Sequence, residues 1–153
     1  MAIMNALNVS ASGMTAQRLR LDIISQNIAN ASTTRDENGE AYRRKTVMFA
    51  EKTSDSASTF SRMLMNKTSG LSETVGNGVR VTAIVEDHVT AMKQVYDPSH
   101  PDANEEGYVT MPNVNTVTEM TNLIDATRSY EANATAFDAS KNILSTGLTI
   151  GSR

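Results

Sequence analysis

The residues best suited to chemistry gather in one acidic stretch around His100. Its acidic neighbours, whose carboxylates could ligate a divalent cation or take part in acid–base catalysis, are Asp97, Asp102, Glu105 and Glu106. The letters DANEEG, which begin at Asp102, also match the first half of a calcium-binding loop. A complete loop has a bidentate glutamate at its twelfth position, and Asn113 stands there instead. We therefore interpret the stretch as a solvated turn; a metal-dependent enzyme centred on His100 is the alternative that a metal-binding measurement would test.

The remaining polar residues do not form a second catalytic set. His88 is isolated beside Glu86 and Asp87, as expected for a residue at a strand edge. The motifs of serine hydrolases, nucleotide-binding loops and zinc peptidases do not occur. The chain has no cysteine, so it has no thiolate chemistry. Its net charge of −3, with one short basic cluster at 43–45, does not create the positive potential that attracts nucleic acid. We predict no catalytic residue, no cofactor, no metal site, no enzymatic activity and no nucleic-acid partner.

Both ends of the chain show the pattern of a long helix with an apolar seam, in which side chains recur mostly every seven residues. The N-terminal seam, within a helix predicted for residues 3–30, consists of Leu7, Met14, Leu21, Ile24 and Ile28. The C-terminal seam consists of Met120, Leu123, Tyr130, Phe137, Leu144 and Leu148. Thr116 and Glu119 match a capping box that would start this second helix, and Gly151 would end it.

The middle of the chain has a different character. Asn38 and Gly39 predict a tight turn, followed by a strand at 40–49 with the sequence EAYRRKTVMF. Residues 51–78 are rich in Ser and Thr and predict a flexible excursion. A second strand is predicted at 78–86, and the following Pro- and Gly-punctuated loop contains a short extended piece at 108–111. This order of elements predicts an α+β fold with the strands inserted between two helices.

We expect a discontinuous helical domain, formed by 1–31 and 115–153, and a β-rich domain over 32–114. Ala16, Leu19 and Ile23 give the first helix a second apolar face, so it needs neighbours on two sides. Ordering the backbone of one helix costs about 30–55 kcal/mol. Burying its seam returns about 10–20 kcal/mol, and its hydrogen bonds about 25 kcal/mol. The helices are therefore expected to be only marginally stable in a single chain, where their outer apolar faces would be exposed to water. They are expected to become stable when several chains pack together.

The N-terminal residues have no basic start and no sustained apolar core, so we do not expect a secretory signal peptide. No run of residues approaches the length of about 18 apolar residues that a transmembrane helix needs. If the protein leaves the cytoplasm, it is expected to use another route.

The stretch SASGMTAQRLRLDIISQNIANASTT resembles the N-terminal helix and Asn-rich turn of the axial proteins of the bacterial flagellum, which form its rod and hook. Three further stretches narrow the resemblance to the rod proteins of the flagellar basal body, and to the proximal rod in particular: GEAYRRKTVMF, VYDPSHPDANEEGYVTMPNVN and EMTNLIDATRSYEANATAFDASKNILSTGLTIG. The likeness covers nearly the whole chain, and the excursion at 51–78 is longer than the family pattern.

The resemblance implies a structural subunit that polymerises through its terminal helices into a drive shaft, which transmits torque and encloses an export channel. It also implies passage through the flagellar type III export apparatus. The partners that it implies are further copies of the chain, the rod proteins FlgB, FlgF and FlgG, and the base adaptor FliE. The two apolar seams would then contact neighbouring subunits, and Asn27 and Asn30 would bond backbone groups at the junction between the helix and the outer domain.

A helical adaptor with a β insert, outside any polymer, is the second hypothesis. Limited proteolysis of dilute protein separates the two hypotheses, because an adaptor keeps its termini protected. A rod subunit is expected to lose roughly its first and last 30 residues and to retain the middle.

Overall fold

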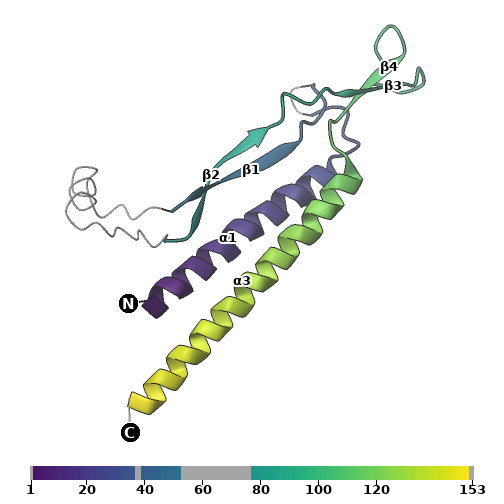
Figure 1. Cartoon of the computed structure of the whole chain (residues 1–153). Helices are drawn as coiled ribbons and strands as arrows, with labels where there is room; N and C mark the ends of the chain where they lie inside the picture. Colours follow the sequence, from purple (N-terminus) through teal and green to yellow (C-terminus); the bar gives the residue numbers. More distant parts are fainter. Residues whose placement is uncertain (1, 37–38, 53–76, 152–153) are drawn as a thin grey trace, which may run out of the picture.

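Two long antiparallel helices lie side by side in the computed structural model, which describes residues 2–36, 39–52 and 77–151 (Figure 1). Helix α1 spans Ala2–Ala29, and helix α3 spans Thr116–Gly151. Between them in the sequence, the described residues form four strands in two small sheets. The predicted α+β class and both terminal helices are confirmed.

The start of α3 differs from the predicted capping box. The side-chain oxygen of Asn115, not Thr116, accepts hydrogen bonds from the backbone N–H groups of Val117 (3.0 Å) and Thr118 (3.3 Å). Asn115 is therefore the N-cap residue. The side chain of Glu119 does not return to the cap; it is fully buried and bonded to other segments. The spacing of Thr116 and Glu119 was misleading because an asparagine one position earlier caps equally well.

Strands β1 (Lys45–Glu51) and β2 (Val79–Glu86) form an antiparallel pair with an irregularity between Met48 and Phe49. Strand β1 begins later than the predicted 40–49, because the preceding backbone bonds elsewhere: the N–H of Tyr42 donates to Thr33 and the N–H of Arg44 to Asn113. At the other end, the N–H of Lys52 donates to the carbonyl of Gly78. The ends of the predicted excursion at 51–78 therefore belong to this strand pair, and residues 53–76 lie outside the described part.

A second antiparallel pair joins β3 (Lys93–Tyr96) to β4 (Tyr108–Met111). The extended piece at 108–111 was predicted, whereas β3 falls in a segment that the sequence left without a strand. Of the predicted turn at Asn38 and Gly39, residue 38 lies outside the described part. On either side of it, the N–H of Asp36 donates to the carbonyl of Glu40, and the N–H of Gly39, which has φ +84°, donates to the carbonyl of Asp36.

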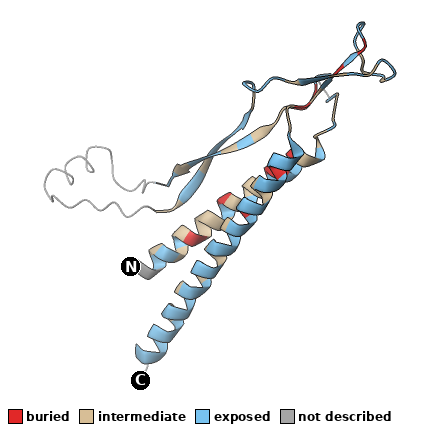
Figure 2. Ribbon diagram, turned by 45° about the vertical axis from the view of Figure 1, so that its right-hand side comes forward, coloured by how far each residue is buried: buried red, intermediate tan, exposed pale blue. Residues whose placement is uncertain are grey.

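The β1–β2 pair packs along α1, so α1 lies between this pair and α3 (Figures 1 and 2). The backbone N–H of Val79 donates to Ser12 Oγ (3.0 Å), and Gly78, with φ +102°, lies against Ser12 and Val9 too closely for a side chain. Ala16 and Ile23 of the second apolar face are buried. The expectation that the second apolar face of α1 is exposed to water was therefore wrong, since the chain's own strands cover this face.

Few side chains are buried in the described part of the chain, and Figure 2 shows that α3 is exposed along most of its length. The buried residues are Ser10, Ala16, Ile23, Ile24, Asn27, Ala41, Tyr42, Gly107, Val109, Pro112, Glu119 and Ala126. Two of the most deeply buried, Asn27 and Glu119, are polar, and both lie where the helices meet the strands.

Candidate assembly surface and the junction that positions it

Asn27 joins three segments of the chain at the end of α1. Its Nδ2 donates to the carbonyl of Lys45 (2.8 Å) and to Glu119 Oε2 (3.0 Å). Its Oδ1 accepts from the N–H of Lys45 (2.9 Å) and from the Tyr42 hydroxyl (2.9 Å). Both donors and both acceptor positions of the amide are thus satisfied, although the residue is 0% exposed. The amide pairs with Lys45 as a neighbouring strand would, and so fixes the start of β1 on α1.

Glu119 supplies the charge of this junction from the first turn of α3. Its Oε1 accepts from Arg44 Nε (2.9 Å) and Nη2 (2.8 Å), and from Asn122 Nδ2 (3.3 Å). The carboxylate is fully buried, whereas the Arg44 side chain is 27% exposed. A buried carboxylate needs such a partner, because an unpaired charge away from water is strongly unfavourable. We call Asn27, Tyr42, Arg44 and Glu119 the junction cluster.

Within the junction cluster, Tyr42 has a raised pKa. Burial raises the pKa of its hydroxyl above 10.0, and the negative charges of Glu86 and Glu119 raise it further. Lys45 Nζ lies over the Tyr42 ring, 5.6 Å from its centroid, and 3.8 Å from Glu86 Oε1. The tyrosine therefore stays neutral and keeps donating to Asn27 over the ordinary pH range.

Asn30 holds the turn that follows α1. Its Nδ2 donates to the carbonyl of Gln26 (2.9 Å), and its Oδ1 accepts from Thr33 Oγ1 (3.1 Å). Asn113 makes a similar link farther on, because it accepts from the N–H of Arg44 and donates to the carbonyls of Asp87 and Thr90. Amide side chains thus replace regular backbone pairing where the chain passes from the helices to the strands.

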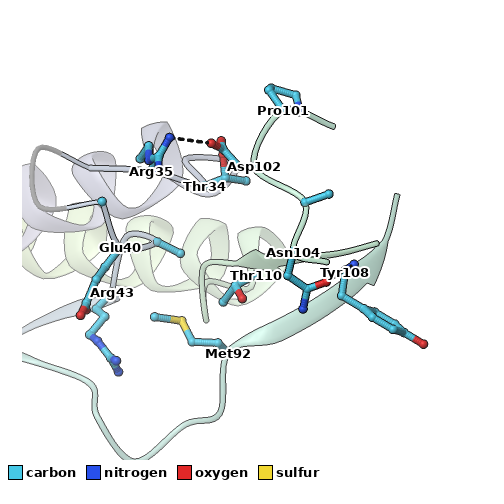
Figure 3. A pocket seen from close by; sticks show the side chains of 13 residues that line it. Thr34, Arg35, Glu40, Arg43, Met92, Pro101, Asp102, Asn104, Tyr108 and Thr110 are labelled. Carbon is cyan, nitrogen blue, oxygen red and sulfur yellow. Dashed lines mark hydrogen bonds and ion pairs between the residues drawn. The ribbon is translucent and has the colours of Figure 1, made fainter. Parts of the chain in front are cut away.

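The loop around His100 packs against the turn after α1 and borders an open polar cavity of about 430 Å³ (Figure 3). Asp102 accepts from Thr34 Oγ1 (2.8 Å) and lies 3.4 Å from Arg35 Nη1. His100 Nδ1 accepts from the N–H of Asp102 (3.1 Å), so this nitrogen closes a local turn. Among the residues that the structure describes, no three His, Asp or Glu side chains converge on a common point. The geometry therefore gives the metal hypothesis no support.

The two helices meet in one register. Gly13 lies against Asn133, whose Oδ1 would be 2.7 Å from a Cβ at position 13, and Asn27 contacts Glu119. Fourteen residues separate each pair from the other along both helices, so one antiparallel register explains both contacts. Continuing this register places Ala2 level with residue 144. The end of α3, residues 145–151, then extends past Ala2 by about 10 Å. Figure 1 shows that α3 continues beyond the start of α1.

The predicted interface residues divide by exposure in the single chain. Ile24 is 5% exposed and packed within the chain, not on its surface. The half-buried residues are Leu7, Met14, Leu21, Ile28, Leu123, Phe137 and Leu144. The exposed residues are Met120 (54%), Tyr130 (37%) and Leu148 (67%). Four further large apolar side chains of α3 are exposed and were not predicted as interface residues: Val117, Ile124, Ile143 and Ile150.

The sequence reasoning also missed three members of the junction cluster, namely Tyr42, Arg44 and Glu119. One signal was present, because Glu119, Ala126 and Asn133 recur every seven residues on the face of α3 that meets α1. Nothing in the local sequence links Arg44 or Tyr42 to that face. The bond from Arg44 to Glu119 joins residues 75 positions apart, and the bond from Tyr42 to Asn27 requires the chain to turn back after α1.

Two family models match the two helical ends of the chain. The model for the flagella basal body rod protein covers residues 7–35, and the model for the C-terminal part of flagellar basal body rod FlgEFG proteins covers residues 105–150. The flagellar basal-body rod protein FlgC of Bacillus subtilis (strain 168) is 49% identical over 99% of both chains. The chain belongs to the FlgC family of flagellar basal-body rod proteins.

Two more FlgC proteins are similar over nearly the full length. Those of Borreliella burgdorferi and Escherichia coli O6:H1 are 41% and 34% identical, and each match covers at least 98% of both chains. The chain is thus a structural subunit of the rod, located in the flagellar basal body, where it assembles with other rod components. No helix in the described ranges is long and apolar enough to cross a membrane. FlgC-family membership decides between the rod subunit and the adaptor in favour of the former.

Proposed function

We propose that this FlgC-family chain polymerises through the apolar surface of its terminal helices. The observation that carries the proposal is the set of large apolar side chains, spread along α3, that the chain leaves exposed: Val117, Met120, Ile124, Tyr130, Ile143, Leu148 and Ile150. On α1, Met4 is the one large apolar side chain exposed in the described part. Apolar surface of this extent on one helix is typical of a site of protein association.

In this proposal, neighbouring subunits cover the outer side of α3 and the half-buried residues of α1. The discontinuous segment 1–31 with 115–153 is then the polymerisation domain, and 32–114 faces outward. The residues of α1 that contact neighbours are Leu7, Met14, Leu21 and Ile28. Ile24 is buried within the chain and packs beneath this surface. The residues of α3 that contact neighbours are Met120, Leu123, Tyr130, Phe137, Leu144 and Leu148. Asn27 and Asn30 hold the junction between the two domains.

The assembled helices form a shaft that transmits torque around an export channel, and the chain reaches it through the flagellar type III export apparatus. Passage through a narrow channel requires a chain that unfolds readily, and the small set of buried apolar side chains supports this route. The partners are further copies of the chain, FlgB, FlgF, FlgG and FliE. Helices with little burial of their own gain order when neighbours cover them, which couples their folding to assembly.

Leu148 offers the sharpest test, because it lies on the segment of α3 that extends past α1. Leu148→Asp removes no contact with α1, so the isolated chain keeps its circular dichroism spectrum and unfolding temperature. It places a charge in the proposed contact and therefore abolishes incorporation into the rod and swimming in soft agar. The matched control, Leu148→Met, keeps an apolar side chain of similar volume and retains swimming. Normal swimming of the Leu148→Asp strain contradicts the proposal.

A further inference from the structure

The contact between α1 and α3 has one large, deeply buried apolar side chain, Ile24, which lies near Glu119 and Asn122. Other buried or tightly packed positions of the contact include Ser10, Gly13 and Ala126, whose side chains are small or absent. Gln17 also contributes, and its Oε1 is buried with no hydrogen-bond partner in the described part of the chain. In paired helices, a polar residue buried at the seam specifies one register at a cost in stability. A buried polar contact that only one register satisfies would add to this packing.

The junction cluster has the required specificity. If α3 slid by one heptad toward the end of α1, Asn27 would face Ala126, which offers no polar atom. If it slid the other way, Asn27 would lie beyond the first residue of α3, Thr116. Either shift leaves the buried amide of Asn27 and the buried carboxylate of Glu119 without each other, whereas the observed register satisfies both.

We propose that Asn27, Glu119 and Arg44 are positioning residues that lock α1 and α3 in one register. The lock includes β1, because the Asn27 amide also bonds both backbone groups of Lys45. A buried polar group that fixes the register of paired helices at some loss of stability is well established as a physical device. The inference rests on the proposed function, since the register sets the height at which residues 145–151 and the exposed apolar side chains of α3 meet a neighbour.

Engineered disulfides can report the register, because the native chain has no cysteine. Gly13→Cys with Asn133→Cys reports the observed register, since these positions are in contact. Gly13→Cys with Ser140→Cys and Asn133→Ala reports a slip of one heptad, since Ser140 follows Asn133 by seven residues and is half-buried. With the lock intact, full-length protein under mild oxidation should close the first pair roughly tenfold faster than the second.

The lock is removed by Asn27→Leu with Glu119→Leu, which replaces these two buried polar side chains by apolar ones and also takes the Asn27 amide away from the Lys45 backbone and the Tyr42 hydroxyl. The ratio of the two closure rates should then fall toward one while the helical circular dichroism signal persists. Glu119→Gln is a milder variant that should shift the ratio in the same direction by a smaller factor, and it decides the matter if the double variant does not fold. If the ratio of closure rates is the same as in the protein with the lock intact, the inference is wrong. That result would not affect the proposed assembly surface.

Swimming in soft agar links the register to assembly. A double variant that loses the native register should also lose rod incorporation. If the register is lost and swimming persists, assembly does not depend on the register, which contradicts this link between the lock and the rod; the Leu148→Asp strain alone then decides the proposed assembly surface. If Leu148→Asp abolishes swimming and the register ratio does not change, the assembly surface is correct and the lock is wrong.

Discussion

Replacing Glu119 by glutamine tests how much the junction cluster stabilises the fold. The substitution keeps the volume of the side chain but replaces one carboxylate oxygen by an NH₂ group and removes the charge. Oε1 accepts from Arg44 and Asn122, and Oε2 accepts from Asn27. Whichever way the new amide is oriented, its NH₂ group faces a donor, either the Arg44 guanidinium or the Asn27 amide. At least one buried hydrogen bond is therefore lost.

The expected loss of stability is about 2 kcal/mol, since hydrogen bonds to a charged group contribute about 1.5–3 kcal/mol. The value lies toward the lower end because Arg44 is 27% exposed and can recover water. A change of this size lowers the unfolding temperature of a chain of this length by about 4–8 °C. It is a large share of the stability available to a domain with so few buried side chains.

Urea unfolding followed by far-ultraviolet circular dichroism measures this loss, and urea is preferable because it does not screen charges. Glu131→Gln is the matched control, since Glu131 is an exposed glutamate of α3, and its effect should stay within about 0.5 kcal/mol. If Glu119→Gln is as stable as the native chain, the junction cluster contributes no net stability and the reasoning is refuted.

Three further predictions concern a glycine pair, the tyrosine of the junction cluster and the C-terminal seam. Gly13→Ala should destabilise the chain in thermal unfolding because the new Cβ would lie 2.7 Å from Asn133 Oδ1, whereas Gly147→Ala, with open space around it, should stabilise it by about 0.5–1 kcal/mol; equal effects would contradict the observed register. The raised pKa of Tyr42 means that the folded state holds its proton more tightly, so stability is complete below pH 10.0 and is lost as the pH rises through the folded-state pKa. Tyr42→Phe should flatten that alkaline loss, at the expense of about 1 kcal/mol near neutral pH for the missing bond to Asn27; an unchanged alkaline limb in a pH series of urea titrations would argue against the burial of the hydroxyl. Phe137→Asp should abolish rod incorporation while the strands remain folded by circular dichroism, and normal motility would count against it.

The heptad spacing of Leu7, Met14 and Leu21, and of Leu123, Tyr130 and Phe137, was sufficient to predict both helices. Local periodicity determines a helix, so α1 and α3 were found nearly to the residue. The same pattern could not tell which neighbour covers which face. The second face of α1, at Ala16 and Ile23, meets the chain's own β1–β2 pair rather than another subunit.

The junction cluster shows why the site was only partly predictable. Asn27 was identified as a residue that bonds backbone groups, and it does bond Lys45. Its principal side-chain partner, Glu119, lies 92 positions away in the sequence and was interpreted as part of a cap. Contacts of this kind depend on the register of two distant helices, which no local pattern encodes. Strand β3 was missed for a related reason, because four residues pair only in the presence of β4.

Cysteine labelling at position 148 tests most directly whether neighbouring subunits cover the helical surface. A Leu148→Cys variant carries the only thiol of the chain, and the side chain it replaces is 67% exposed in the single chain. We predict that a maleimide reagent labels the dilute, isolated protein at the rate of a free exposed thiol. In purified basal bodies from a motile strain carrying this variant, labelling should be slower by at least tenfold. Equal labelling rates in the two states would contradict the account.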